Sequence, residues 1–443
     1  MRPPLLFIQL FIWVAAAHAQ PKTLEASIDE YIRPFTVTQN FFGTVYVSKA
    51  GEVLYEKSFG KASIETNTNN ENNTIYHLAS VSKPFTATAI LLLEQQGKLT
   101  TQDLLSRYIP GFKNGNKITL HHLLTHTSGI LNINNLPEYD KWSLTSQSLD
   151  SIVGIFSQSP LEFEPGAKYS YSNSNYNVLA YIIEKVSGLP YGEFLKKNIF
   201  DVLGMNSTRH HGNAQSVIMN VATGYSPLGR EELERAPYLN WSIKTGNGSL
   251  YSTVEDLARF ERALSTESLL NKSSREKMFT ANLSDVGFGW FIRPYLNHDR
   301  HYIGGRSPGF STYFSRYPRD QVCIIVLSNL YIPTTTEIGV SLSSLVFGEP
   351  ITLRQLNDEP FNTAIGDRYT GQYQMGEDFF RPGMKLGITY KEGRLSCSFG
   401  DLIRESKDEF ILRSFWSIVK FERNTAGKIT GIHFDKSKGQ RIE

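Results

Sequence analysis

Two residues in the first quarter of the chain have the types and spacing needed for nucleophilic catalysis. Ser80 and Lys83 form an S-x-x-K pair, and the apolar run 86–95 follows almost directly. Residues three apart share a helix face, so the hydroxyl and the amine would meet. Burial at the root of an apolar helix favours the neutral amine. The spacing therefore predicts a serine nucleophile beside a neutral amine.

The S-x-x-K spacing alone does not single out this serine. A serine before a helix is an ordinary N-cap. The same spacing recurs in the polar stretch 274–277 and in the strand-like run 417–420. Ser80 differs because Pro84, a residue suited to the first turn of a helix, and a long apolar helix follow it. The catalytic interpretation depends on what the rest of the chain supplies.

A second polar segment precedes another amphipathic helix. Tyr171 and Asn173 lie two residues apart, just before the helix predicted over 178–186. A phenol and an amide held on such a loop could face one site. Loops rich in Ser and Asn more often form hydrogen-bonded turns, so these residues taken alone favour a turn.

The histidines and cysteines do not predict a metal site. His121, His122 and His126 lie close together, but no further ligand stands at metal-ligand spacing, which favours packing and helix capping. Cys323 and Cys397 lie in apolar strand-like runs of different predicted domains, which favours buried thiols over a disulfide. We expect neither a metal nor an organic cofactor.

Composition and the N-terminus restrict the class of protein. The 443 residues include 45 basic and 43 acidic side chains, a net charge of +2, which argues against a nucleic-acid partner. Residues 1–19 combine Arg2, the apolar run 5–14 and an Ala17-His18-Ala19 cleavage pattern, as in a signal peptide. We expect cleavage after Ala19, export to the periplasm or medium, and no membrane span in the mature chain.

Strand-like segments flank a helical middle region. This order predicts an α+β domain over residues 20–350, with an antiparallel sheet flanked by helices. A polar linker at 351–358 leads into six short predicted strands within 359–443, which indicate a small β-barrel or sandwich-like domain. The strands predicted for the main sheet are 42–48, 53–59, 287–292, 302–305, 310–317 and 321–328.

Several of these segments together resemble a known family. The first is the Ser80–Lys83 motif, the second is Tyr171-Ser172-Asn173, and Pro308-Gly309-Phe310 stands where the strand of a third motif is expected. The chain thereby resembles the serine β-lactamase and penicillin-binding protein superfamily, in its class C, D-aminopeptidase and esterase branch. Supporting segments lie at 97–99, 118–129, 203–205 and 252–257.

The resemblance implies an α/β domain packed against an all-α subdomain with the active site between them, and a β domain as an appendage. It implies that Ser80 is acylated, that Lys83 helps move the proton, and that Tyr171 acts as a phenolate base. Asn173 would bind the substrate's amide. The N–H groups of Ser80 and Arg306 would form the oxyanion hole.

The third motif departs from the family pattern. The family has Lys or His, one residue and then Gly, whereas this chain has Ile303-Gly304-Gly305. The cation that helps hold a substrate carboxylate is therefore absent from position 303. His301 and Arg306 are the nearest candidates to replace it, although 301 lies well along the strand. We expect weak β-lactam hydrolysis and a preference for ester or neutral amide substrates.

The sequence as a whole predicts an exported serine hydrolase that forms an acyl-enzyme on Ser80. Its substrates would be peptide, ester or β-lactam-type carbonyls, with D-amino-acid peptidase or esterase activity foremost. The expected partners are small-molecule or peptide substrates, peptidoglycan fragments among them. The alternative is a catalytically silent protein that binds cell wall or peptidoglycan.

Overall fold

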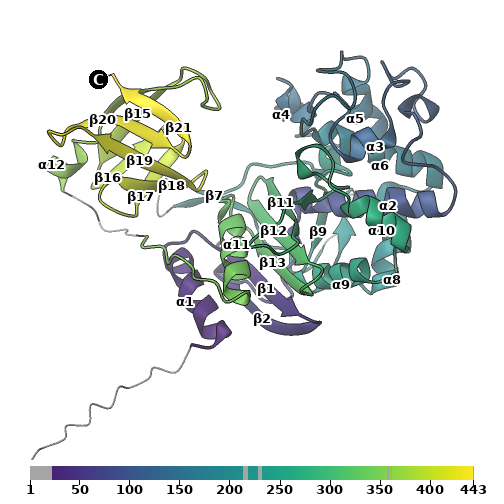
Figure 1. Cartoon of the computed structure of the whole chain (residues 1–443), viewed down its shortest axis with the longest axis horizontal. Coiled ribbons are helices and arrows are strands. Elements are labelled where there is room, and N and C mark those ends of the chain that lie inside the picture. Colours follow the sequence, from purple (N-terminus) through teal and green to yellow (C-terminus); the bar gives the residue numbers. More distant parts are fainter. Residues whose placement is uncertain (1–21, 213–217, 228–231, 357–359, 361, 443) are drawn as a thin grey trace, which may run out of the picture.

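The structure is a computed structural model that describes residues 22–212, 218–227, 232–356, 360 and 362–442. The predicted signal peptide, residues 1–19, lies outside the described residues. Figure 1 shows a mixed helix-and-sheet domain and, at the C-terminal end of the chain, a separate barrel. Within the described ranges, no helix is long and apolar enough to cross a membrane.

A six-stranded antiparallel sheet organises the first domain. Its strand order is β10-β11-β12-β13-β1-β2, so the N-terminal hairpin pairs with strands from the far end of the domain; Val45 lies opposite Val326. This confirms the predicted antiparallel sheet. The strands are β1 Gly43–Lys49, β2 Glu52–Phe59, β10 Phe291–Ile292, β11 His301–Ser307, β12 Phe310–Tyr317 and β13 Val322–Ser328.

The segment predicted as a strand over 287–292 is mostly a tight turn. Only Phe291 and Ile292 pair as a strand. Gly289 has a φ of +81°, and a Cβ there would lie 2.8 Å from the backbone nitrogen of Pro84. The turn therefore packs against the start of the helix that follows Ser80, which the missing side chain of Gly289 permits.

Helices cover both faces of the sheet. On one face, α1 Leu24–Val37 and α11 Thr334–Val346 bury Ile28, Ile32 and Ile338 against the strands. On the other face, α9 Val254–Ser265 contacts β1 and β13. The buried helix α2 Lys83–Gln95 belongs to the core of this second face and of the helical region beyond it.

The middle of the chain forms the helical region. Its longest helix, α6 Asn173–Ser187, packs against α2, α3 and α5, as an amphipathic helix with a buried face should. The other helices of the first domain are α3 Leu120–Leu124, α4 Tyr139–Trp142, α5 Leu149–Phe156, α7 Tyr191–Leu195, α8 Asp201–Leu203 and α10 Lys272–Phe279. The short helix α12 Thr363–Gly366 precedes the barrel strands. Short strands are β3 Lys61–Ser63, β4 Thr68–Asn69, β5 Tyr76–His77, β6 Arg209–His210, β7 Tyr225–Pro227, β8 Leu233–Arg235 and β9 Leu250–Ser252.

The C-terminal domain is a closed barrel of eight sequential strands. Two of them were not predicted. β17 begins at Gly400, which has a φ of +125°, and only Ser398 and Phe399 separate it from β16; β21 buries only Gly439 and so lacks an apolar alternation. The strands are β14 Gly371–Met375, β15 Lys385–Lys391, β16 Arg394–Cys397, β17 Gly400–Arg404, β18 Glu409–Leu412, β19 Ser417–Arg423, β20 Ile429–Phe434 and β21 Ser437–Arg441.

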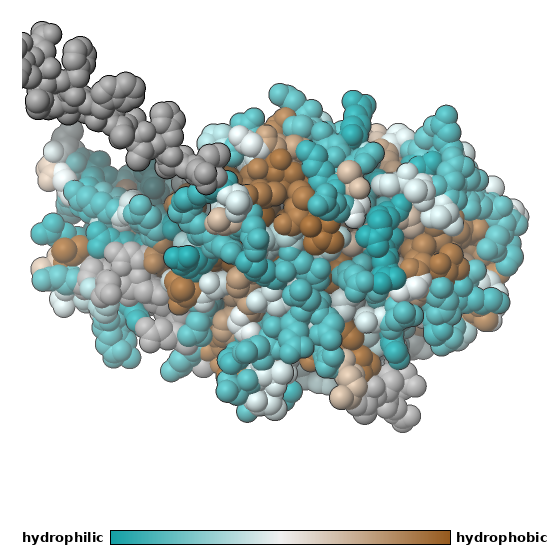
Figure 2. Space-filling view, turned by 90° about the horizontal axis from the view of Figure 1, so that it is seen from below, coloured by the Kyte–Doolittle hydropathy of each residue, from teal (hydrophilic) through white to brown (hydrophobic). Residues whose placement is uncertain are grey.

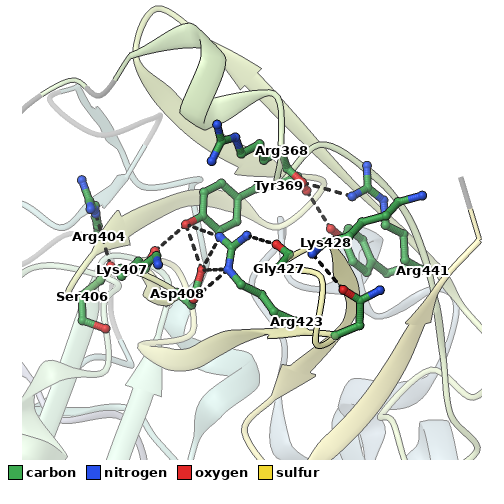
Figure 3. A network of polar contacts seen from close by, with 12 residues as sticks. Arg368, Tyr369, Arg404, Ser406, Lys407, Asp408, Arg423, Gly427, Lys428 and Arg441 are labelled. Carbon is green, nitrogen blue, oxygen red and sulfur yellow. Dashed lines mark hydrogen bonds and ion pairs between the residues drawn. The ribbon is translucent and has the colours of Figure 1, made fainter.

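Side chains fill the barrel interior, and a polar network lies at one end of it. Tyr373, Phe410 and Phe421 are among the buried interior residues. In the network of Figure 3, Arg423 donates to both carboxylate oxygens of Asp408 and to the Tyr369 hydroxyl. An eight-stranded barrel is narrow enough for side chains to fill.

The barrel loop 413–416 contacts the first domain. Arg413, 1% exposed, donates to the Asn40 side-chain oxygen and to the Gln39 carbonyl, each at 2.8 Å. The Trp416 indole donates to Glu337 on α11 at 2.7 Å. These contacts join the barrel to the end of α1 and to α11.

The two cysteines are not joined in a disulfide. Cys323 and Cys397 are both free, but Cys397 is half-buried rather than buried as predicted, because it ends its strand. Figure 2 shows one face of the molecule, where hydrophobic groups form separate patches in a mostly hydrophilic surface.

Candidate active site

Ser80 lies in a short 3-10 turn, Ala79–Ser82, that leads into α2. Ala79 adopts a φ of +47°, an unfavourable conformation for a residue with a Cβ. Lys83 is the first residue of α2 and so follows Ser80 by one turn. The strained turn presents the Ser80 hydroxyl, which is only half-buried, at the end of a rigid buried helix.

The structure brings together four residues selected from the sequence. The Ser80 hydroxyl lies 2.8 Å from the Tyr171 hydroxyl and 3.0 Å from the Lys83 amine. The amine also donates to the Asn173 side-chain oxygen at 2.9 Å and to the Asn247 carbonyl at 2.8 Å. The Ser80 hydroxyl therefore stands between an amine and a phenol, both within reach for proton transfer.

The electrostatics favour a neutral amine and a neutral phenol. Burial, followed by the nearby Lys244, holds the pKa of Lys83 well below its usual range. Burial raises the pKa of Tyr171 above its usual range. The expected phenolate does not fit this site, because the amine that would stabilise it is itself buried and deprotonates readily.

His126 supports Tyr171. Its ring lies 4.5 Å from the Tyr171 ring, and its Nδ1 accepts the backbone N–H of Ser172 at 3.3 Å. Burial lowers the pKa of His126 to about 3, so the ring is neutral. His122 caps its helix by accepting the N–H of Thr119. These contacts match the packing and capping roles predicted for the histidines.

Strand β11 passes very close to Ser80. A Cβ on Gly305 would lie 2.5 Å from the Leu78 carbonyl oxygen and 2.9 Å from the Ser80 nitrogen. Gly304 faces the opposite way, where its nearest neighbours are 3.7 Å distant. Ile303, on the same strand face as Gly305, is buried in the apolar core. A hydrophobic side chain therefore occupies the position of the family's cation.

Neither candidate replacement supplies that cation. His301 is 5% exposed and stacks on Phe279, and burial lowers its pKa to about 3. Arg306 lies on the other strand face, where its guanidinium donates to the carbonyl oxygens of Tyr331 and Ser414. Ser414 belongs to the barrel loop, so Arg306 joins β11 to the barrel.

Sequence reasoning missed three residues at this site. Asn247 supplies a carbonyl to Lys83, Asn134 accepts a hydrogen bond from the Asn173 amide at 2.7 Å, and Lys244 is a second buried amine near Lys83. Lys244 begins the tripeptide Lys-Thr-Gly. The family's third motif can have these letters, but here they stand outside the strand where that motif belongs.

Comparison with known proteins identifies the family. The family model described as Beta-lactamase matches residues 28–338. Penicillin-binding protein 4* of Bacillus subtilis (strain 168) is 32% identical over 419 residues, which cover 86% of this chain and 90% of that protein. The chain belongs to the beta-lactamase family. This beta-lactamase-family protein is accordingly a serine hydrolase.

Solved structures agree with this fold. The octameric penicillin-binding protein homologue from Pyrococcus abyssi has a TM-score of 0.66 at 24% identity, over 93% of this chain and 99% of that one. The D-amino acid amidase from Ochrobactrum anthropi SV3 has a TM-score of 0.66 at 21% identity, over 73% and 98%. At these identities the likeness shows that the beta-lactamase-family fold is shared.

Proposed function

We propose that this protein is an exported serine hydrolase that forms an acyl-enzyme on Ser80. We further propose that it acts on D-amino-acid peptides, amides or esters and only weakly on β-lactams. The observation that carries the proposal is the position of the Ser80 hydroxyl, within hydrogen-bond distance of both Lys83 and Tyr171. The signal-like residues 1–19 support export.

In the proposed mechanism the neutral Lys83 amine accepts the proton of Ser80 as the oxygen attacks the substrate carbonyl. The N–H groups of Ser80 and Arg306 stabilise the oxyanion; donors of this kind contribute about 3 kcal/mol each. Tyr171 then carries the proton from the amine to the leaving group. Water releases the acyl group by the reverse proton path and regenerates Ser80.

Two features support the proposed substrate class. On strand β11, the buried Ile303 stands where the family has the cation that would hold a β-lactam carboxylate. The fold is also shared with a D-amino acid amidase and a D-stereospecific amidohydrolase.

Intact mass spectrometry after incubation with a penicillin, nitrocefin, a D-amino acid amide and short activated esters tests the proposal. We expect a covalent adduct on the wild-type protein and none on Ser80→Ala. Ser417→Ala, the serine of another S-x-x-K match, is the matched control and should still form the adduct. If no panel member forms an adduct or turns over, the silent cell-wall-binding alternative is favoured.

A further inference from the structure

Lys244 lies one tight turn before Asn247, whose carbonyl binds the Lys83 amine. It ends the 3-10 turn Trp241–Lys244 and precedes the loop to β9. Its carbonyl accepts the N–H groups of Asn247 and Gly248 at 2.9 and 2.8 Å. The carbonyl of Asn247 in turn accepts the hydrogen bond from Lys83. The position of Lys244 is thus coupled to the Lys83 amine by two consecutive contacts, and that amine in turn donates to Ser80.

Helix α6 holds the backbone on both sides of Lys244. The side-chain amide of Asn177 donates to the Ile243 carbonyl at 3.2 Å and to the Thr245 carbonyl at 2.8 Å. Asn177 lies one turn after Asn173 on α6. The helix that places Asn173 beside Lys83 therefore also places Lys244.

Among the described residues, the Lys244 amine lies over an aromatic ring and has no polar partner. The side chain belongs to a residue that is 9% exposed, and its Nζ lies 5.2 Å from the centre of the Tyr139 ring. It makes no hydrogen bond or ion pair with any residue in the described ranges, whereas Lys83 donates to three oxygen atoms. Because the Nζ atom is not fully enclosed by protein, it stays open to water and can pair with a ligand.

Lys244 carries its charge on the helical side of the site. Burial lowers the pKa of Lys244 to about 8, which leaves most molecules protonated at pH 7. Tyr139 follows Asn134 closely in the chain, and Asn134 binds the amide of Asn173. Ile303 lies on the opposite, sheet side. The positive charge is therefore on the side of Asn173, where the family resemblance places the substrate's amide.

We infer that Lys244 binds a carboxylate on the acyl part of the substrate, the part that Asn173 holds. The chemical class is an acyl donor that ends in a carboxylate, such as a glutaryl-type group. The inference rests on the proposed function and deepens it. A carboxylate would pair with an amine that makes no hydrogen bond or ion pair within the described residues, and a charge-assisted pair of this kind is stronger than a neutral one.

Two activated esters with one leaving group test this inference. p-Nitrophenyl hemiglutarate and p-nitrophenyl valerate both carry five-carbon acyl groups and differ in the terminal carboxylate. We expect the wild-type protein to prefer the hemiglutarate at least about tenfold in kcat/KM at low salt, since a buried charge pair exceeds about 1.4 kcal/mol. In Lys244→Met this ratio should fall to about one, mainly through KM.

Lys272→Met is the matched control, because Lys272 is an exposed lysine on α10. It should retain the wild-type ratio. Equal kcat/KM for the two esters in the wild-type protein, or an unchanged ratio in Lys244→Met, would overturn the inference while hydrolysis of the valerate still supported the proposed function.

Calorimetry on Ser80→Ala tests carboxylate binding by Lys244 separately from the proposed hydrolase activity. The probe is an N-glutaryl amide that this variant cannot hydrolyse, with the N-valeryl amide as its neutral counterpart. Preferential binding of the glutaryl compound, lost in Ser80→Ala combined with Lys244→Met, would support the inference even if no ester were hydrolysed. Equal binding of both amides would contradict it.

Discussion

Lys83 donates to a hydroxyl, an amide oxygen and a backbone carbonyl, and none of these three acceptors is a carboxylate. Its charged form is therefore stabilised only by dipoles, while burial opposes it. Ser80 gains a neutral amine as its neighbour without any dedicated acidic residue.

The pH dependence of acylation follows from this arrangement. The proposed mechanism requires the neutral Lys83 amine, so the rate with a neutral ester should rise with pH and level off well below the usual pKa of a lysine. Removal of the Lys244 charge raises the pKa of Lys83, so Lys244→Met should move this acid limb to higher pH. A pH–rate profile from pH 5 to 10 measures both, and an unmoved limb would refute the coupling.

Position 303 sets the polarity of the sheet side of the site. Ile303→His would restore a side chain that can carry charge beside the nucleophile, and we expect faster acylation by penicillin. Stopped-flow or mass-based acylation rates would show the increase. Because Ile303 is 3% exposed, thermal denaturation must confirm that the variant folds. Unchanged acylation by a folded variant would show that the missing cation does not limit β-lactam reactivity.

Strand β11 contributes at the scale of an element, because its backbone forms one wall of the site. Its approach to Ser80 leaves no room for a Cβ at Gly305. The Thr312 hydroxyl on the neighbouring strand β12 donates to the Leu78 carbonyl at 2.9 Å. This hydrogen bond also holds the segment before Ser80 close to the sheet. The position of the proposed oxyanion donors thus depends on two adjacent strands.

Gly305→Ala should push β11 away from Ser80 and lower kcat with an activated ester about 100-fold or more, the loss typical of a displaced oxyanion donor. Gly304→Ala is the neighbouring comparison, since its Cβ would meet nothing closer than 3.7 Å. We expect a much smaller loss there. Equal losses in the two variants, measured at matched thermal stability, would count against the close-approach argument.

Across the whole molecule, the barrel and the first domain share a small set of polar contacts. Arg413 and Trp416 reach α1 and α11, while Arg306 extends from β11 to the Ser414 carbonyl. Arg354 adds a further link, because it pairs with Glu337 on α11 and with Glu405 beyond β17. The barrel therefore contacts the strand that also borders the nucleophile.

Arg413→Met should lower the free energy of unfolding by about 2 kcal/mol or more, because it leaves buried acceptors without their charged donor. Chemical denaturation monitored by fluorescence would measure the change. Arg319→Met is the control, since that side chain is 85% exposed and should alter stability little. Similar stabilities for the two variants would mean that the interdomain contact contributes little.

Local patterns in the sequence determined most of the secondary structure elements of this protein. The apolar run after Ser80, the amphipathic helix after Tyr171 and the alternating strands specified the elements and the antiparallel sheet. The S-x-x-K spacing, together with the helix predicted after Pro84, placed an amine beside a hydroxyl, because three residues span about one helical turn. The two missed barrel strands lacked a usable pattern, because β17 follows β16 after only Ser398 and Phe399, and β21 is polar.

Only the tertiary structure decided the charges at the site. Lys83 and Asn247 are 164 residues apart, and Lys244 has no local pattern that marks it as part of the site. The protonation of Lys83 and Tyr171 depends on how much protein surrounds them, which spacing does not encode. Burial and long-range contact, which arise only when distant segments pack together, set the chemistry of residues that the sequence had already placed in pairs.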